Sequence, residues 1–351
     1  MRIIFAALFV AGATLTVPLP ATAWDYPGHR IVGAIADGIL AANFHHTRDK
    51  VEKLLRSHDS DGNELKRSLR EVAVFPDCAK SNNVPFCGRV PSKEEVAFTA
   101  RNKGNGGYHF TDVPLEQPKY VANSPGTEKT DIVQMINFII AQLRQKKPQL
   151  EGVSLTDPEA VWLLAHLVGD IHQPLHVGAA YFDKDTCTTR VDPTNVPGGT
   201  DAVAQTIGGN AIELEATSGS PAAPLADTLH IFWDGPAVAW AMQAKGLAGA
   251  EQEYARMLAA EPPTGWQTAG DPETWAEQWV NEVLPTAVKA HNDLTIELKE
   301  RTVTGTKVSC TWKTKINKAY SDWAQGIARD QLAKAGFRLA ALLVALFPNT
   351  P

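Results

Sequence analysis

The stretch that decides the fold is 165-AHLVGDIHQPLH-176, a short segment unusually rich in histidine. His166 and Asp170 are four residues apart, so on a helix they share one face and can bind the same metal ion. Pro174 ends or kinks such a helix, which lets His176 turn toward the same centre instead of following the helical spiral. The stretch therefore predicts a helix that ends in a metal site.

A second stretch, 229-LHIFWD-234, repeats the spacing with His230 and Asp234, and its apolar residues would anchor it in the core. A lone buried histidine is more often a satisfied core residue than a ligand. Two His-x-x-x-Asp pairs and a further histidine are instead typical of a metal site. Histidine and carboxylate ligands without thiolate suit zinc, and suit iron or manganese less well.

The first 23 residues have the pattern of a secretory signal peptide, with an apolar run at residues 3–10 and the small residues 21-ATA-23 before the cut. The apolar run is too short to anchor the chain in a membrane. Cleavage after Ala23 would free the amine of Trp24, which with its own carbonyl oxygen can chelate a zinc ion. His29 can supply an imidazole to the same ion. We therefore expect a secreted or periplasmic protein.

Composition is that of an ordinary globular protein. The chain has 351 residues, of which 44% are hydrophobic and 21% charged, and its formal net charge is -6. The sequence has no run of lysine or arginine, so charge alone argues against a nucleic-acid partner. It also lacks the H-E-x-x-H, G-x-S-x-G and G-x-x-x-x-G-K-[ST] motifs, which leaves zincin protease, α/β-hydrolase and P-loop functions without support.

Apolar residues recur at helical spacing along most of the chain, and strand signals are sparse. We expect one mainly α domain over residues 24–351, with a long irregular loop or small hairpin excursion at 183–227. Asp157 is the expected N-cap of the central helix, with Pro158 at its first position. The apolar tail at residues 339–347 should pack in the core. Helices are predicted at 29–40, 131–143, 158–171, 272–290 and 316–347.

Four cysteines fit two disulfides in an oxidising compartment. Cys78 with Cys87 is the natural short loop, and Cys187 with Cys310 follows by elimination. Free buried thiols are the alternative. A cysteine-type zinc site is not expected, because no C-x-x-C spacing occurs.

The order of the polar residues resembles that of the S1/P1 nuclease family, zinc-dependent nucleases with a mostly helical fold related to bacterial zinc phospholipase C. The resemblance covers essentially the whole chain after the leader, more loosely through 275-WAE-277 and 331-QLAKAGFRLA-340. The residues that carry it are Trp24, His29, Asp77, His109, His166, Asp170, His176, His230 and Asp234.

This resemblance implies three Zn²⁺ ions. One would be held by Asp77, His109, His166 and Asp170, and a second by His176, His230 and Asp234. The third would be held by Trp24, His29 and the bridging Asp170. Three such ions outweigh the three aspartates by roughly three positive charges, so a phosphodiester can be drawn to an acidic protein. The other histidines (His45, His46, His58, His172 and His291) are expected at the surface or behind the ligands.

The resemblance also implies roles in hydrolysis that leaves 5′-phosphate products. Asp77 would orient the attacking water or accept its proton. Lys80 stands where the family more often has arginine, and would either neutralise phosphate charge or be an ordinary surface lysine. Phe110 would stack a base, unless it only packs in the core, and Asp112 would accept hydrogen bonds from a base edge. Stacking needs unpaired bases, so single-stranded DNA and RNA are the expected substrates.

Two other functions remain open at this point. A phospholipase C-like phosphodiesterase would use the same metals on a lipid headgroup, and a secreted zinc-binding protein would hold them with no open coordination position. Asp234 and the pair Phe110 and Asp112 favour the nuclease. Whether 3′-mononucleotides are also dephosphorylated stays open. We expect a monomer with no stable protein partner and no membrane anchor.

Overall fold

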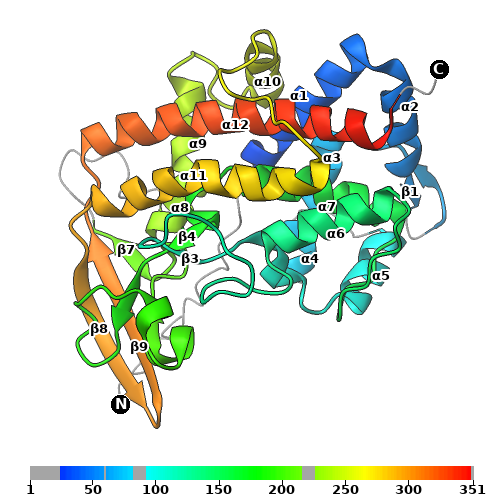
Figure 1. Cartoon of the computed structure of the whole chain (residues 1–351). Coiled ribbons are helices and arrows are strands. Elements are labelled where there is room, and N and C mark those ends of the chain that lie inside the picture. Colours follow the sequence, from blue (N-terminus) through cyan, green and yellow to red (C-terminus); the bar gives the residue numbers. More distant parts are fainter. Residues whose placement is uncertain (1–23, 59–60, 82–91, 216–225, 349–351) are drawn as a thin grey trace, which may run out of the picture.

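The computed structural model describes residues 24–58, 61–81, 92–215 and 226–348, and these are mainly helical, as predicted (Figure 1). The long helices are α1 (Tyr26–Asn43), α7 (Asp157–Asp170), α11 (Trp275–Asn292) and α12 (Lys318–Leu346). Shorter helices are α2 (His45–Leu54), α3 (Leu69–Val72), α4 (Phe75–Ser81), α5 (Lys93–Arg101), α6 (Ile132–Leu143), α8 (Leu229–Asp234), α9 (Pro236–Gln243) and α10 (Glu251–Ala259).

Helix α7 is the centre of the fold, because it is buried on every side from Glu159 to Asp170. A helix that is apolar all round belongs in the core of a protein. Its N-cap is Thr156, which forms a capping box with Glu159, so the prediction of Asp157 as the cap was wrong by one residue. The turn after α7 leads into the short 3₁₀ helix η2 (Pro174–His176).

Helix α12 packs directly along α1. A Cβ added to Gly336 would lie 2.5 Å from Cβ of Ile35, so the two helices approach as closely as glycine allows. Two residues before Ile35, a Cβ on Gly33 would lie 2.6 Å from the backbone of Leu69 in α3, so α1 is closely packed here as well. The apolar tail of α12 is buried in the core, as predicted, through residues such as Leu339 and Leu343.

One long hairpin was missed by the sequence analysis. Strands β8 (Glu297–Thr304) and β9 (Lys307–Thr314) are antiparallel and joined at Gly305, and β7 (Ile212–Leu214) adds a parallel strand beside β9. The hairpin projects from the helical body (Figure 1). Its many lysines and glutamates hide the strand pattern, because most of β8 is exposed and needs no apolar face.

The remaining strands are short pairs. Strand β1 (Ser57–His58) pairs with β2 (Glu64–Leu65), and β3 (Val113–Pro114) pairs in parallel with β4 (Gly178–Ala179). In the segment predicted as irregular, β5 (Tyr181–Asp183) pairs with β6 (Val203–Gln205), and short 3₁₀ turns fill much of the connection between them. Over its described residues the segment therefore agrees with the second expected alternative, a small strand excursion.

The disulfide between Cys187 and Cys310 is present, as predicted, and it ties this excursion to β9. The other predicted pair, Cys78 with Cys87, lies outside the described residues because Cys87 is not among them. The leader at residues 1–23 also lies outside them. In the described part of the chain, no helix has both the length and the apolar character needed to cross a membrane.

Candidate metal centre

The predicted ligands come from distant parts of the chain and meet around the C-terminal end of α7. Asp77 comes from α4, His109 ends the 3₁₀ helix η1 (Asn105–His109), and His29 lies in the first turns of α1. All nine predicted ligand residues are at most 5% exposed. Three groups are close enough to hold metal ions: His29, Asp77 and His166; His109, His166 and Asp170; and His176, His230 and Asp234.

The group built on α7 has the spacing of a tetrahedral site. Nε2 of His166 lies 2.9 Å from Nδ1 of His109, and Oδ2 of Asp170 lies 3.0 Å from both nitrogens. Oδ1 of Asp77 is 3.7 Å from His166 and 3.8 Å from His109. Four ligand atoms around a zinc ion at ~2.0–2.1 Å should be roughly 3.3 Å apart. These four atoms therefore fit around one ion.

The group on η2 and α8 gives a direct test of fit. His176 Nδ1 donates to the carbonyl of His109 at 2.8 Å, and His230 Nδ1 donates to the carbonyl of Gly208 at 2.7 Å. In neutral rings both Nε2 atoms then carry lone pairs, and these atoms face each other at 3.1 Å. Oδ2 of Asp234 lies 3.3 Å from Nε2 of His230. A cation between the rings would remove this repulsion, and His176, His230 and Asp234 would be its ligands.

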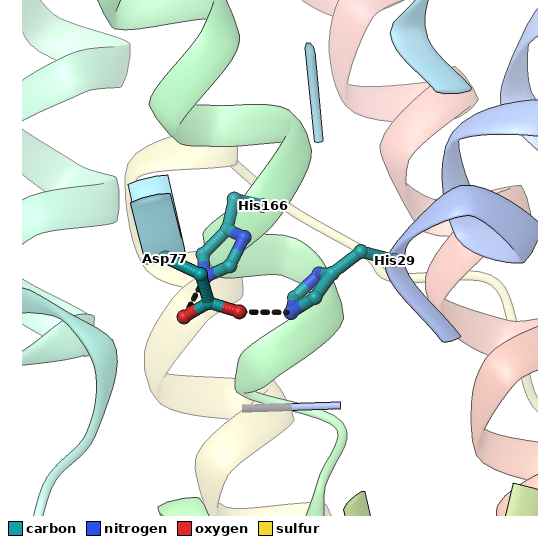
Figure 2. A group of neighbouring side chains, drawn as sticks. All are labelled: His29, Asp77 and His166. Carbon is teal, nitrogen blue, oxygen red and sulfur yellow. Dashed lines mark ion pairs between the residues drawn. The ribbon is translucent and has the colours of Figure 1, made fainter. Parts of the chain in front are cut away.

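The third group joins α1 to the first. Figure 2 shows Asp77 between His29 and His166, with one carboxylate oxygen toward each ring. His29 Nε2 is 3.9 Å from Oδ2 of Asp77 and 3.2 Å from Oδ1 of Asp170, and its ring stacks on that of His166. Both aspartates therefore present one oxygen to each of two neighbouring positions, which is the arrangement a bridging carboxylate needs.

Trp24 is fully buried beside this group. Its indole Nε1 donates to the carbonyl of Gly169 at 2.8 Å, and the next residue, Asp25, donates its backbone N–H to the carbonyl of Asp234 at 2.9 Å. These contacts hold the Trp24 side chain against α7, next to Asp170 in sequence, and hold the following residue against α8. The metal-binding role of its amine and carbonyl remains a prediction.

The pKa shifts of the predicted ligands show which of these side chains are in the protonation state that binds a cation. Burial lowers the pKa of His109 and of His230 to about 3, so both rings are neutral at neutral pH. Burial alone would raise the pKa of Asp170, but His166 and His29 outweigh it and hold that pKa well below its usual value. Burial raises the pKa of Asp234 well above its usual value, so a bound cation would be needed to keep it ionised.

Lys80 lies inside the site rather than at the surface. Its Nζ is 2.9 Å from Oδ1 of Asp77, and its side chain is largely buried. Burial would lower its pKa, but the carboxylates of Asp77 and Asp170 more than compensate and raise it. Lys80 therefore keeps its positive charge beside the ligands.

A cavity of about 280 Å³ opens onto this centre and is lined by Lys80, His109, His176 and His230. Phe110, half-buried, and Asp112 form part of its wall, as a substrate pocket would require. Burial, with Asp131 and Glu128 nearby, raises the pKa of Asp112 to about 7.

The opposite wall was not anticipated from the sequence. It contains Ile207, which is 47% exposed, together with Gly208 and Asn210. Ile207 has a φ of 53°, a left-handed conformation that is rare for a β-branched residue and often marks a functional site. The sequence signal for this turn was the Gly208-Gly209 pair. Glycine adopts positive φ at little cost, and both residues have positive φ in the structure.

The remaining histidines divide between the surface and the interior. His45, His46 and His58 are exposed, as expected. His172 and His291 are buried, which excludes the first of their two expected positions, the surface, and leaves the position behind the ligands as a prediction. His172 donates from Nδ1 to the carbonyl of Val168 and its Nε2 accepts from Arg338 of α12, while Nδ1 of His291 donates to the carbonyl of Ala287.

Comparison with known proteins gives one result that covers nearly the whole chain. A search of curated proteins found no match to the chain. A family model described as S1/P1 Nuclease matches residues 24–348, so it includes every residue of the three groups, the cavity and the helices that support them. The chain therefore belongs to the S1/P1 nuclease family.

Proposed function

We propose that this protein is a secreted zinc-dependent endonuclease that cleaves single-stranded DNA and RNA and leaves 5′-phosphate products. The observation that carries the proposal is the position of the cavity. It places an aromatic ring and a carboxyl group next to buried histidines and aspartates that are spaced for metal ions. Membership of a nuclease family makes nucleic acid the substrate class.

We assign three zinc ions to the site. Asp77, His109, His166 and Asp170 would hold the first, and His176, His230 and Asp234 the second. The amine and carbonyl of Trp24, with His29 and Asp170, would hold the third. The tetrahedral spacing and the facing nitrogen lone pairs support the first two sets. The short distance from His29 to Asp170 supports the third.

Zinc bound here would supply a low-pKa water and a positive charge for the phosphoryl oxygens. Burial would raise the pKa of Asp77, but Lys80 and the neighbouring histidines hold it below its usual value. A weak base of this kind is better suited to orient the attacking water than to keep its proton. Lys80, charged and 2.9 Å from Asp77, would then neutralise charge that develops on the phosphate.

Base binding would come from Phe110 and Asp112. A base stacked on the Phe110 ring must be unpaired, which favours single strands. Asp112 lies deep in the same wall and can meet polar atoms on the base edge. A lipid headgroup has no flat ring to stack, so these two residues favour the nuclease over a phospholipase.

Secretion would complete the site. Cleavage after Ala23 would turn the peptide nitrogen of Trp24 into a free amine, which can bind zinc. The disulfide between Cys187 and Cys310 fits an oxidising compartment, as secretion requires.

The test combines metal counting with a substrate comparison on protein purified after leader removal. We expect three zinc ions per chain and hydrolysis of single-stranded DNA and RNA, with little turnover of duplex DNA or phosphatidylcholine. A 3′-mononucleotide assayed alongside reports any second activity. Fewer than two tightly held ions per chain, or a preference for the lipid, would refute the proposal.

A further inference from the structure

Gln173 is the residue that connects the predicted ligands of two ions. It lies in the turn between α7 and η2 and is completely buried. Its backbone N–H donates to the carbonyl of Asp170 at 2.9 Å, and its own carbonyl accepts from the N–H of His176 at 3.0 Å. Its side chain turns away from that backbone path and reaches Asp234 in α8.

The orientation of the Gln173 amide is fixed by its partners. The backbone N–H of Leu175 is a donor, so the group it meets must be the oxygen Oε1, which caps the start of η2. The nitrogen Nε2 must then face Asp234, where it donates to Oδ1 at 2.7 Å. The reverse orientation would set two donors against each other and two oxygens against each other.

This donor acts on one carboxylate oxygen only. Oδ1 of Asp234 is occupied by Gln173, while Oδ2 points to Nε2 of His230 at 3.3 Å. The histidines of the same group are oriented in a comparable way, through the carbonyls of His109 and Gly208. Gln173 thus completes a set in which every ligand side chain is held by one neighbouring polar group.

We propose that Gln173 is a positioning residue for the ion held by His176, His230 and Asp234. Its amide orients the carboxylate of Asp234 so that one oxygen faces His230, and its cap on η2 fixes the turn that carries His176. The inference rests on the proposed metal-dependent function, because it assigns one residue to one of the three ions.

Gln173→Glu separates the two contacts of the amide. The new carboxylate still accepts from Leu175, so the cap on η2 is kept, but it sets an oxygen against Oδ1 of Asp234. A matched control is Gln142→Glu, since Gln142 also donates to an aspartate, Asp157, at 3.1 Å, but on α6. Both variants make the same chemical change beside a carboxylate.

The measurement is zinc affinity, by competition with a chromophoric chelator, with thermal unfolding of the metal-free protein as a second readout. We expect Gln173→Glu to weaken one of three ions by about 10–100-fold, the usual effect of removing a group that orients a ligand. The other two ions should stay within about twofold. Gln142→Glu should leave all three unchanged.

A double-mutant cycle tests the contact itself. In an Asp234→Asn background the new amide can donate to the carboxylate of Gln173→Glu, so the second substitution should cost less than in the native background. If Gln173→Glu does not fold, Gln173→Met removes the donor without adding charge, and the same loss at one ion is expected.

Two results would overturn the inference: three ions still bound at native affinity, or an equal loss at all three with a lower melting temperature of the metal-free protein. Neither depends on nuclease assays. Loss of one ion from a protein that cleaves no nucleic acid would instead sink the proposed function and leave Gln173 in its role.

Discussion

Phe110→Ala tests whether the cavity binds a base. The side chain is half-buried in the wall of a cavity of about 280 Å³, so truncation removes the proposed stacking surface and leaves every proposed metal ligand unsubstituted. Stacking of a base on an aromatic ring contributes ~1–3 kcal/mol. Since about 1.4 kcal/mol is a factor of ten, KM for a single-stranded oligonucleotide should rise roughly 5- to 150-fold.

The assay is steady-state cleavage of a single-stranded oligonucleotide, compared with an abasic strand of the same length. On the abasic strand the variant and the native protein should be alike, because neither has a base to stack. Phe44→Ala is the matched control, since Phe44 is a half-buried phenylalanine at the junction of α1 and α2. An unchanged KM on the normal strand, or an equal rise on the abasic strand, would refute base stacking.

Three further results are expected. Lys80→Met should lower kcat about 100-fold and Lys80→Arg less than tenfold, because the second variant keeps the positive charge. Equal losses of kcat in the two variants, measured by steady-state cleavage, would argue against an electrostatic role. Protein that retains Ala23 should hold two zinc ions instead of three by elemental analysis, because Trp24 then has no free amine. His109 and His230 have native pKa values of about 3 against about 6.5 when unfolded, so at these two rings only the unfolded chain gains protons between these values. The melting temperature of the metal-free protein should therefore fall as pH drops from 6.5 toward 3, and a flat profile would contradict the buried neutral rings.

The central helix, and the place of His166 and Asp170 on one of its faces, were predictable because their signals are local. His166 and Asp170 share a face at a spacing that any helix imposes, and the proline after them ends it. The long hairpin was not predictable in the same way. It buries little of β8, so no alternation of apolar and polar residues marks that strand.

The rest of the site depends on contacts that no local pattern reports. His172 is buried, and the group that donates a hydrogen bond to its Nε2, Arg338, lies 166 residues later. Ile207 faces the cavity only because the following glycines take left-handed conformations that bring the loop back over η2. A Cβ on Gly208 would lie 2.3 Å from the carbonyl oxygen of Leu175, so there is no room for a side chain at position 208.

The proposed ligands and part of the helical framework that positions them lie in different parts of the chain. Every proposed ligand precedes residue 235, while two of the four long helices, α11 and α12, come afterward. Trp233, next to Asp234, donates to the hydroxyl of Tyr320, and α12 lies against α1 through Gly336. A product cut short after α8 would carry each proposed donor atom and still lack the frame that gathers them. Disruption of the final helix should therefore abolish activity as completely as substitution of a histidine ligand. A search for the ligand motifs alone would still find all of them in such a fragment.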